Sequence, residues 1–152
     1  MVNAYRVEVI RTRIAEPSGP LNGPEAVARH YRNLQQYDRE RLVRLDLDNR
    51  NRLIGEETVS IGTADAALVS PREVFKGAIL NSASRIIVLH NHPSGDPQPS
   101  DEDRELAVRL RQVGELLAVP LIDFLIIGED GQYCYVDADT GEARTRQLEV
   151  RA

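Results

Sequence analysis

Apolar residues recur along this chain with two different spacings. Positions 27, 31 and 34 are apolar at the i, i+4, i+7 spacing of an amphipathic helix, which predicts a helix from Pro24 to about Tyr37. Val43, Leu45 and Leu47 instead alternate with charged residues, which is typical of a half-buried strand. The same reasoning predicts further strands at Tyr5–Arg13, Arg52–Gly62, Ile86–Leu89, Pro120–Ile127 and Gln132–Val136, and further helices beginning at Pro71 and Asp101.

The two later helices have recognisable first turns. Ser70 and Ser100 are each followed three residues later by an acidic residue, the pattern of a capping box. The expected buried positions are Phe75, Ala78, Ile79 and Ser82 in the first of these helices, and Leu106, Leu110, Val113 and Leu117 in the second.

The order of these elements predicts an α/β fold with one mixed β-sheet and helices on its faces. Ile86–Leu89 is apolar at every position, so we expect it to be a central strand covered on both sides. We expect an N-terminal strand and loop over residues 1–22, a domain over 23–137, and a loose polar tail over 138–152.

Composition narrows the classes of protein that this chain can be. No apolar run reaches the roughly 18 residues of a membrane span, and no secretory signal is visible, so we expect a cytoplasmic protein without a membrane partner. A single cysteine, Cys134, excludes an internal disulfide and a thiolate metal cage. The net charge of −5 gives no support for nucleic-acid binding.

The segment from His90 to Asp103 holds the residues with the clearest chemistry. His90 and His92 lie two residues apart at the end of a buried strand, so their rings point to the same side and can share one ion. The loop that follows is rich in proline and returns the chain to a helix whose first turn contains Asp103. Two histidines and one carboxylate form the ligand set of a hydrolytic zinc site.

Simpler interpretations of the same residues remain open at this point. Ser100 and Asp103 form a capping box whether or not a metal binds. Two histidines at the end of a strand also occur as an ordinary polar rim. The other candidates for the metal shell are Asp96, Asp101 and Glu102, whereas we expect His30 to be a packed or edge histidine and Cys134 a small buried residue.

The whole pattern resembles a known signature. His90-x-His92, seven residues, Ser100, two residues and Asp103 are similar to the JAMM motif of the MPN (JAB1/Mov34) metalloprotease superfamily. The string His90–Pro97 resembles its RadC branch in particular, and the similarity runs from about Gly23 to Val136. The resemblance implies a cytidine-deaminase-like three-layer sandwich, in agreement with the predicted element order.

The resemblance also implies roles for individual residues. His90, His92 and Asp103 match the zinc ligands, and Ser100 matches the residue that stabilises the oxyanion. The general acid/base of the family is a glutamate just before the strand that follows the first helix, a place that Glu40 fits. The rivals Glu56 and Glu57 lie on the next strand.

These matches predict a zinc-dependent metallopeptidase or isopeptidase-type hydrolase with one zinc ion per chain and a peptide or protein substrate. The alternative is a catalytically silent, metal-stabilised binding module associated with DNA metabolism. A deaminase is disfavoured because the Pro-Cys-x-x-Cys ligands are missing, and a two-metal nuclease because too few carboxylates converge.

The sequence differs from longer RadC-type proteins at its beginning. Those proteins carry an N-terminal helical region that resembles a helix-hairpin-helix DNA-binding module, and this sequence lacks such a region. The family resemblance is therefore poor support for nucleic-acid binding by this chain alone. A homo-oligomer is compatible with the sequence, which does not specify the oligomeric state.

Overall fold

The sheet of this protein is mixed, with one parallel pair of strands in an otherwise antiparallel order. The computed structural model describes residues 2–62 and 69–149, and within them six strands lie in the order β2-β1-β3-β4-β5-β6. Only β3 and β4 are parallel neighbours. The elements are α1 (Pro24–His30), the 3-10 helix η1 (Arg32–Gln36), β1 (Arg41–Leu47), β2 (Leu53–Ile61), α2 (Pro71–Leu80), β3 (Arg85–Asn91), α3 (Asp101–Leu117), β4 (Leu121–Ile127), β5 (Gln132–Val136) and β6 (Ala143–Gln147).

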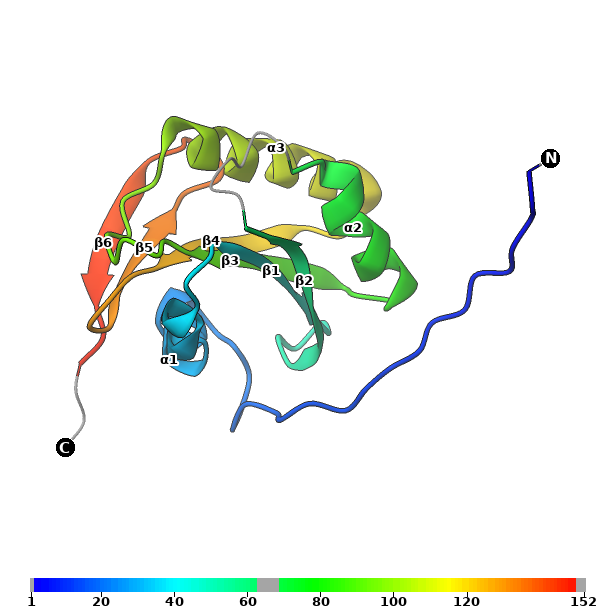
Figure 1. Cartoon of the computed structure of the whole chain (residues 1–152), viewed down its shortest axis with the longest axis horizontal. Coiled ribbons are helices and arrows are strands. Elements are labelled where there is room, and N and C mark those ends of the chain that lie inside the picture. Colours follow the sequence, from blue (N-terminus) through cyan, green and yellow to red (C-terminus); the bar gives the residue numbers. More distant parts are fainter. Residues whose placement is uncertain (1, 63–68, 150–152) are drawn as a thin grey trace.

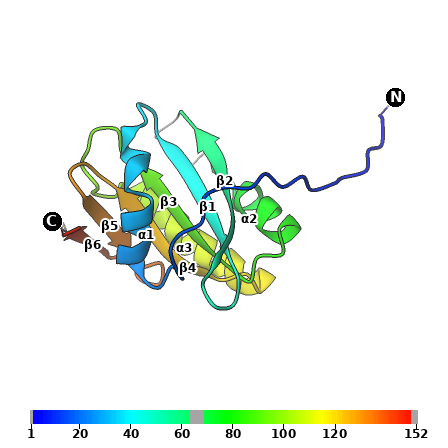
Figure 2. The same cartoon turned by 90° about the horizontal axis from the view of Figure 1, so that it is seen from below.

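Helices cover both faces of the sheet. Figure 1 shows α2 and α3 on one face and α1 on the other, and Figure 2 shows the same arrangement from below. Alternate residues of β3 enter the two cores, Ile86 and Val88 on the α2/α3 side and Ile87 and Leu89 on the α1 side. The predicted α/β fold class and the central strand with two covered faces are confirmed.

β1 differs from the prediction of a half-buried strand. Arg44 and Asp46, the charged positions of its alternating pattern, are only 2% and 1% exposed. They form an ion pair beneath α2, with Arg44 Nε 2.6 Å from Asp46 Oδ1. Two opposite charges that pair with each other can be buried together. The alternation of apolar and charged residues in β1 therefore did not mean that its charged side chains are exposed.

The predicted hairpins are confirmed, and the helix caps largely follow the prediction. β1 pairs with β2, and β4 with β5, in antiparallel register. The Ser70 side chain accepts a hydrogen bond from the Arg72 N–H at the start of α2. The buried faces of α2 and α3 contain fewer residues than predicted, because Ile79, Ser82 and Leu117 are exposed. No helix within the described ranges is both long and apolar enough to cross a membrane.

The N-terminal part of the chain departs from two predictions. Tyr5–Arg13 has no regular secondary structure, because no neighbouring strand pairs with it among the described residues. The first helix ends at His30, short of the predicted Tyr37, and the chain continues as η1.

The C-terminal part departs from the expected loose tail. Ala143–Gln147 forms β6, which pairs with β5 along its whole length. Four of its five residues are exposed, and the strand is therefore polar in composition although it is part of the sheet. This polar composition made the segment look like a tail in the sequence. Charged side chains on an edge strand are common because they discourage further pairing.

Candidate metal centre

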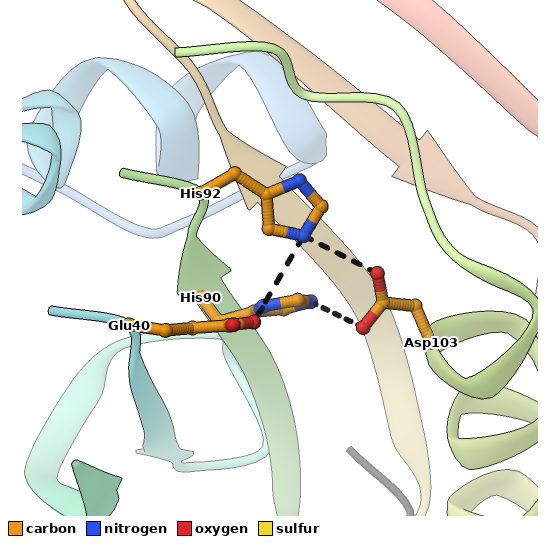
Figure 3. Close-up of side chains that lie close together, drawn as sticks. All are labelled: Glu40, His90, His92 and Asp103. Carbon is orange, nitrogen blue, oxygen red and sulfur yellow. Dashed lines mark hydrogen bonds and ion pairs between the residues drawn. The ribbon is translucent and has the colours of Figure 1, made fainter. Parts of the chain in front are cut away.

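Three segments that are far apart in the sequence meet at the carboxyl end of β3. Leu42 of β1 pairs with His90 of β3 in antiparallel register, so Glu40, just before β1, lies across from His92, just after β3. α3 begins beside them and brings Asp103 in its first turn. Figure 3 shows the side chains of Glu40, His90, His92 and Asp103 pointing toward one another.

The four side chains lie at short distances. His90 contacts Glu40 through Nδ1, 2.5 Å from Oε1, and contacts Asp103 through Nε2, 3.3 Å from Oδ1. His92 Nε2 lies 3.2 Å from Asp103 Oδ2 and 3.9 Å from Glu40 Oε1. One ligand atom from each residue lies within 4.8 Å of the others, and within the described ranges this is the one such group of His, Cys, Asp and Glu. The structure thus brings together the three residues predicted as metal ligands and the glutamate predicted as acid/base.

The cluster contains buried polar atoms whose hydrogen-bonding capacity is not used by the described residues. His90 and Asp103 are both 1% exposed. His90 Nε2 and Asp103 Oδ1 lie 3.3 Å apart without forming a hydrogen bond, and neither atom makes another hydrogen bond among residues 2–62 and 69–149. A buried polar atom without a partner is unfavourable, and imidazole nitrogen and carboxylate oxygen are ligand atoms that divalent metals accept. The residues present therefore fit a metal ion.

The electrostatics of the cluster also favour positive charge. Burial opposes ionisation of Asp103, but His92, His90 and the Ser100 N–H outweigh it and lower the pKa of Asp103. Burial likewise opposes the charged form of His92, yet Asp103, the Asp96 carbonyl and Glu40 raise the pKa of His92. The position between these side chains attracts a cation, either a proton or a metal ion.

His92 is oriented by the loop that follows β3. Its Nδ1 lies 2.9 Å from the backbone carbonyl oxygen of Asp96, so in the neutral ring Nδ1 carries the proton and Nε2 keeps the lone pair. Gly95 holds the loop close to the hairpin after β4, because its φ is +89° and an added Cβ would lie 2.5 Å from Glu129 Cδ. This orienting carbonyl could not be foreseen, since any residue at position 96 supplies one.

Asn91 fixes the segment that carries Glu40. Asn91 lies between the two histidines in the sequence, and its side chain is fully buried. Asn91 Oδ1 accepts from the Arg41 N–H at 2.8 Å, and Nδ2 donates to the carbonyls of Arg39 at 3.1 Å and Tyr37 at 3.4 Å. Arg39 and Arg41 flank Glu40, so the amide holds the backbone on both sides of it. Sequence reasoning missed Asn91; an amide between two candidate ligands was the available signal.

Ser100 caps α3 and contacts one member of the cluster. Its Oγ accepts from the Asp103 N–H at 3.1 Å, and its own N–H donates to Asp103 Oδ2 at 2.9 Å, which completes the predicted capping box. The capping function and the cluster therefore share Asp103. The Ser100 side chain is exposed, and its hydroxyl proton is not used by the cap.

The rival glutamates lie outside the cluster. Glu56 Oε2 accepts from the Tyr31 hydroxyl at 2.7 Å, and Glu57 Oε1 lies 2.6 Å from Nη1 of Arg44. Both belong to β2, one strand farther from the histidines than β1.

The remaining candidates also lie elsewhere. Asp96, Asp101 and Glu102 are exposed and do not belong to the group of potential ligands. His30 is exposed at the end of α1, with its ring packed edge-on against Tyr31. Cys134 is fully buried in the core on the α2/α3 side, as expected of a small buried residue.

Comparison with known proteins places this arrangement in a family. The protein-family model described as "RadC-like JAB domain" matches residues 21–141 of this chain, a range that contains all four clustered side chains. A "UPF0758 protein" from Syntrophotalea carbinolica is 43% identical over 122 residues, which are 80% of this chain and 54% of that protein. One from Methanosarcina acetivorans is 42% identical over 125 residues, 82% of this chain and 54% of that protein. The chain spans about half the length of these curated relatives.

Proposed function

Because this chain belongs to the RadC-like JAB domain family, we propose that it is a zinc-dependent hydrolase that cleaves an amide bond in a peptide or protein. His90, His92 and Asp103 would hold one zinc ion per chain. Glu40 would act as general acid/base, and Ser100 would help to stabilise the oxyanion. The fourth coordination position would remain open to water or substrate, as in catalytic zinc sites.

The convergence of four side chains from three separate segments carries the proposal. Two imidazoles and two carboxylates offer ligand atoms within 4.8 Å of one another. A polar rim or a helix cap alone would not need Glu40 beside both histidines, nor leave His90 Nε2 and Asp103 Oδ1 buried without a hydrogen-bond partner among the described residues. Two nitrogen ligands and one carboxylate are the set used by hydrolytic zinc sites.

The chemistry divides between the ion and the chain. A zinc ion bound by these residues would supply Lewis acidity, which would polarise a substrate carbonyl and lower the pKa of a water to about 7. Glu40 then accepts one proton of the attacking water as its oxygen bonds to the carbonyl carbon. As the carbon–nitrogen bond breaks, Glu40 returns that proton to the leaving nitrogen, so that it is regenerated as a carboxylate.

Ser100 has a hydroxyl that can act on the carbonyl oxygen. Its Oγ already accepts from the Asp103 N–H, which orients it at the start of α3. The free O–H can therefore donate to the negative charge that develops on the carbonyl oxygen. The same Asp103 that would bind zinc positions this hydroxyl.

One observation favours a second function, a metal-stabilised binding module without catalysis. Glu40 Oε1 lies 2.5 Å from His90 Nδ1, a contact by which a carboxylate orients a metal-binding histidine. In this second function, orienting His90 is the whole role of Glu40. In that case Glu40 contributes to metal affinity and moves no proton.

The substitution Glu40→Gln separates these functions because it is nearly isosteric. If Glu40 is the acid/base, Glu40→Gln lowers turnover by about 10²–10⁴-fold while zinc affinity is kept. If Glu40 only orients His90, the same change weakens zinc affinity by about 10–100-fold. Zinc binding is measured by competition with a chromogenic chelator, and turnover on a peptide library read by mass spectrometry. Glu56→Gln is the matched control, since this exposed glutamate lies outside the cluster.

The outcomes exclude one another. Protein that takes up no zinc after chelator treatment contradicts both functions. Zinc-loaded protein that cleaves no member of the library, with Glu40→Gln reducing zinc affinity, supports the binding module instead of the hydrolase.

A further inference from the structure

An N-terminal arm, Tyr5–Arg13, has the pattern of a strand without a partner. Tyr5, Val7 and Val9 alternate with charged residues and are 81%, 75% and 48% exposed. Within the described ranges, residues 2–20 make no backbone hydrogen bond, and the first such bond joins the Leu21 N–H to the turn between β1 and β2.

The N-terminal end of the arm extends away from the body of the protein. Figures 1 and 2 both show its N-terminal end far from the sheet and the helices. Ile10 is 90% exposed, so four apolar side chains within six residues face solvent. Contiguous exposed apolar residues of this kind mark a surface that another molecule covers.

A matching surface lies along β2. Among the described residues β2 is an edge strand, paired with β1 on one side only. Ile54 and Ile61 of β2 and Ile79 and Leu80 of the adjoining α2 are 40–53% exposed. An unpaired strand edge with apolar neighbours is a template for another strand, because its N–H and C=O groups lack partners.

The arm and β2 are complementary in length and charge. Tyr5–Arg13 and Leu53–Ile61 each contain nine residues, about 30 Å of extended chain. The arm carries three arginines and one glutamate, whereas β2 carries no basic residue and two glutamates, of which Glu57 is already paired with Arg44. We propose that the arm of one copy of this chain pairs with the free edge of β2 in a second copy. This association does not depend on the proposed zinc chemistry.

The position of the arm favours a second copy over pairing within one chain. Residues 8–14 pass the start of the chain's own β2 but leave a cavity of about 530 Å³ between the arm and the flank formed by β2 and α2. The arm therefore lies beside the start of its own β2 but makes no backbone hydrogen bond with it. In a dimer with a two-fold axis, each arm pairs with β2 of the other copy. The backbone N–H and C=O groups of both arms and both β2 edges then have partners, and the assembly is closed.

The mass of the full chain in solution tests the association. Sedimentation equilibrium from about 1 to about 100 µM should give twice the 17.0 kDa of one chain. The double variant Val7→Glu, Val9→Glu should raise the dimer dissociation constant at least about tenfold, since it removes apolar contacts and adds negative charge opposite the acidic edge of β2. The double variant Leu116→Glu, Leu117→Glu on α3 has the same added charge at exposed apolar positions and should stay dimeric.

Cross-linking distinguishes a second copy from the chain's own β2. Val9→Cys and Ile54→Cys are made in separate proteins, mixed, and treated with a short bismaleimide; the native Cys134 is buried and does not react. A product that joins the two different proteins supports the proposal. A link that forms within the double variant but not in the mixture overturns it in favour of the chain's own edge. A mass of 17.0 kDa at the highest concentration also overturns it.

Discussion

β1 takes part in two groups of buried charge that differ in how completely they are hydrogen-bonded. Beneath α2, Arg44 donates to Asp46 at 2.6 and 3.1 Å, to Glu57 at 2.6 Å, and to the Val74 carbonyl at 2.9 Å. Asp46 also accepts from Asn81 Nδ2 at 2.9 Å. In this Arg44 cluster, charge is balanced by opposite charge from the chain itself.

The second group, at the start of β1, is balanced differently. It combines two carboxylates, Glu40 and Asp103, with two histidines, and the described part of the chain supplies no arginine or lysine partner of the kind found beneath α2. His90 Nε2 and Asp103 Oδ1 lack hydrogen-bond partners among the described residues, although both are buried. The comparison teaches that burial of charge alone does not identify a functional site. Buried ligand atoms that make no hydrogen bond among the described residues distinguish the candidate metal centre from the Arg44 cluster.

The largest expected effect breaks the Arg44 cluster. Arg44→Met removes the cation and leaves Asp46 buried without its ion-pair partner, so we expect a loss of about 3–5 kcal/mol in the free energy of unfolding. Urea unfolding of the metal-free protein measures this loss. Zinc stoichiometry of the folded variant should be unchanged, because Arg44 does not belong to the group of potential ligands.

The matched control for Arg44→Met is Arg52→Ala. Arg52 pairs with Asp48 at 2.8 Å, but its side chain is 61% exposed, so its loss should change stability by less than about 1 kcal/mol. Equal effects of the two substitutions would contradict the structural role given to the Arg44 cluster.

The next effect concerns the candidate metal centre. Zinc at about 100 times its dissociation constant should stabilise the wild type by about 2.7 kcal/mol. Asp103→Asn keeps some capping ability but loses the anionic ligand, so the metal-free variant should lose less than about 1 kcal/mol while most of the zinc-dependent gain disappears. Thermal unfolding with and without zinc measures both quantities. A full zinc-dependent gain in the variant would mean that Asp103 is only a cap.

A lone carboxylate on β4 provides a smaller test of uncompensated burial. Burial raises the pKa of Asp123 to about 6 from an ordinary 3.8. The folded state therefore binds the proton more tightly, and this contribution to stability is present below pH 3.8 and is lost as the pH rises through about 6. The full shift corresponds to about 3 kcal/mol at pH 7, and because Asp123 is only partly buried, Asp123→Asn should stabilise the protein by less than this at pH 7 and have little effect near pH 4. A benefit that is independent of pH would contradict burial as the cause.

The smallest effects compare the two serine caps. Ser70→Ala and Ser100→Ala should each destabilise the protein by about 1 kcal/mol, because each removes one side-chain bond to a helix N–H. Only Ser100→Ala should also weaken zinc binding, since Ser100 holds the backbone of Asp103. Denaturation and chelator competition on both variants separate the two properties. A reduction in zinc affinity by Ser70→Ala would contradict this distinction.

Part of the candidate site was predictable because its residues lie close together in the sequence. His90 and His92 follow a strand recognisable from its apolar residues, and Asp103 follows a cap recognisable from Ser100. The spacing alone still left a polar rim and a capped helix as alternatives. The resemblance to the JAMM motif was needed to prefer a metal centre.

Other parts of the site depend on pairing between distant segments. Glu40 could be preferred to Glu56 and Glu57 only by resemblance, because no local pattern states which glutamate faces the histidines. The register of β1 against β3 places Glu40 there, and the buried amide of Asn91 holds it.

The sequence by itself determined the elements whose stability is local: the helices with capped first turns, the apolar central strand, the two hairpins and the spacing of the histidines. Periodicity and capping act over a few residues, so they can be recognised without the fold. Only the tertiary structure decided the burial of Arg44 with Asp46, the inclusion of β6 in the sheet and the meeting of Glu40 with Asp103. These features depend on strand order and register, which arise from contacts between residues far apart in the chain.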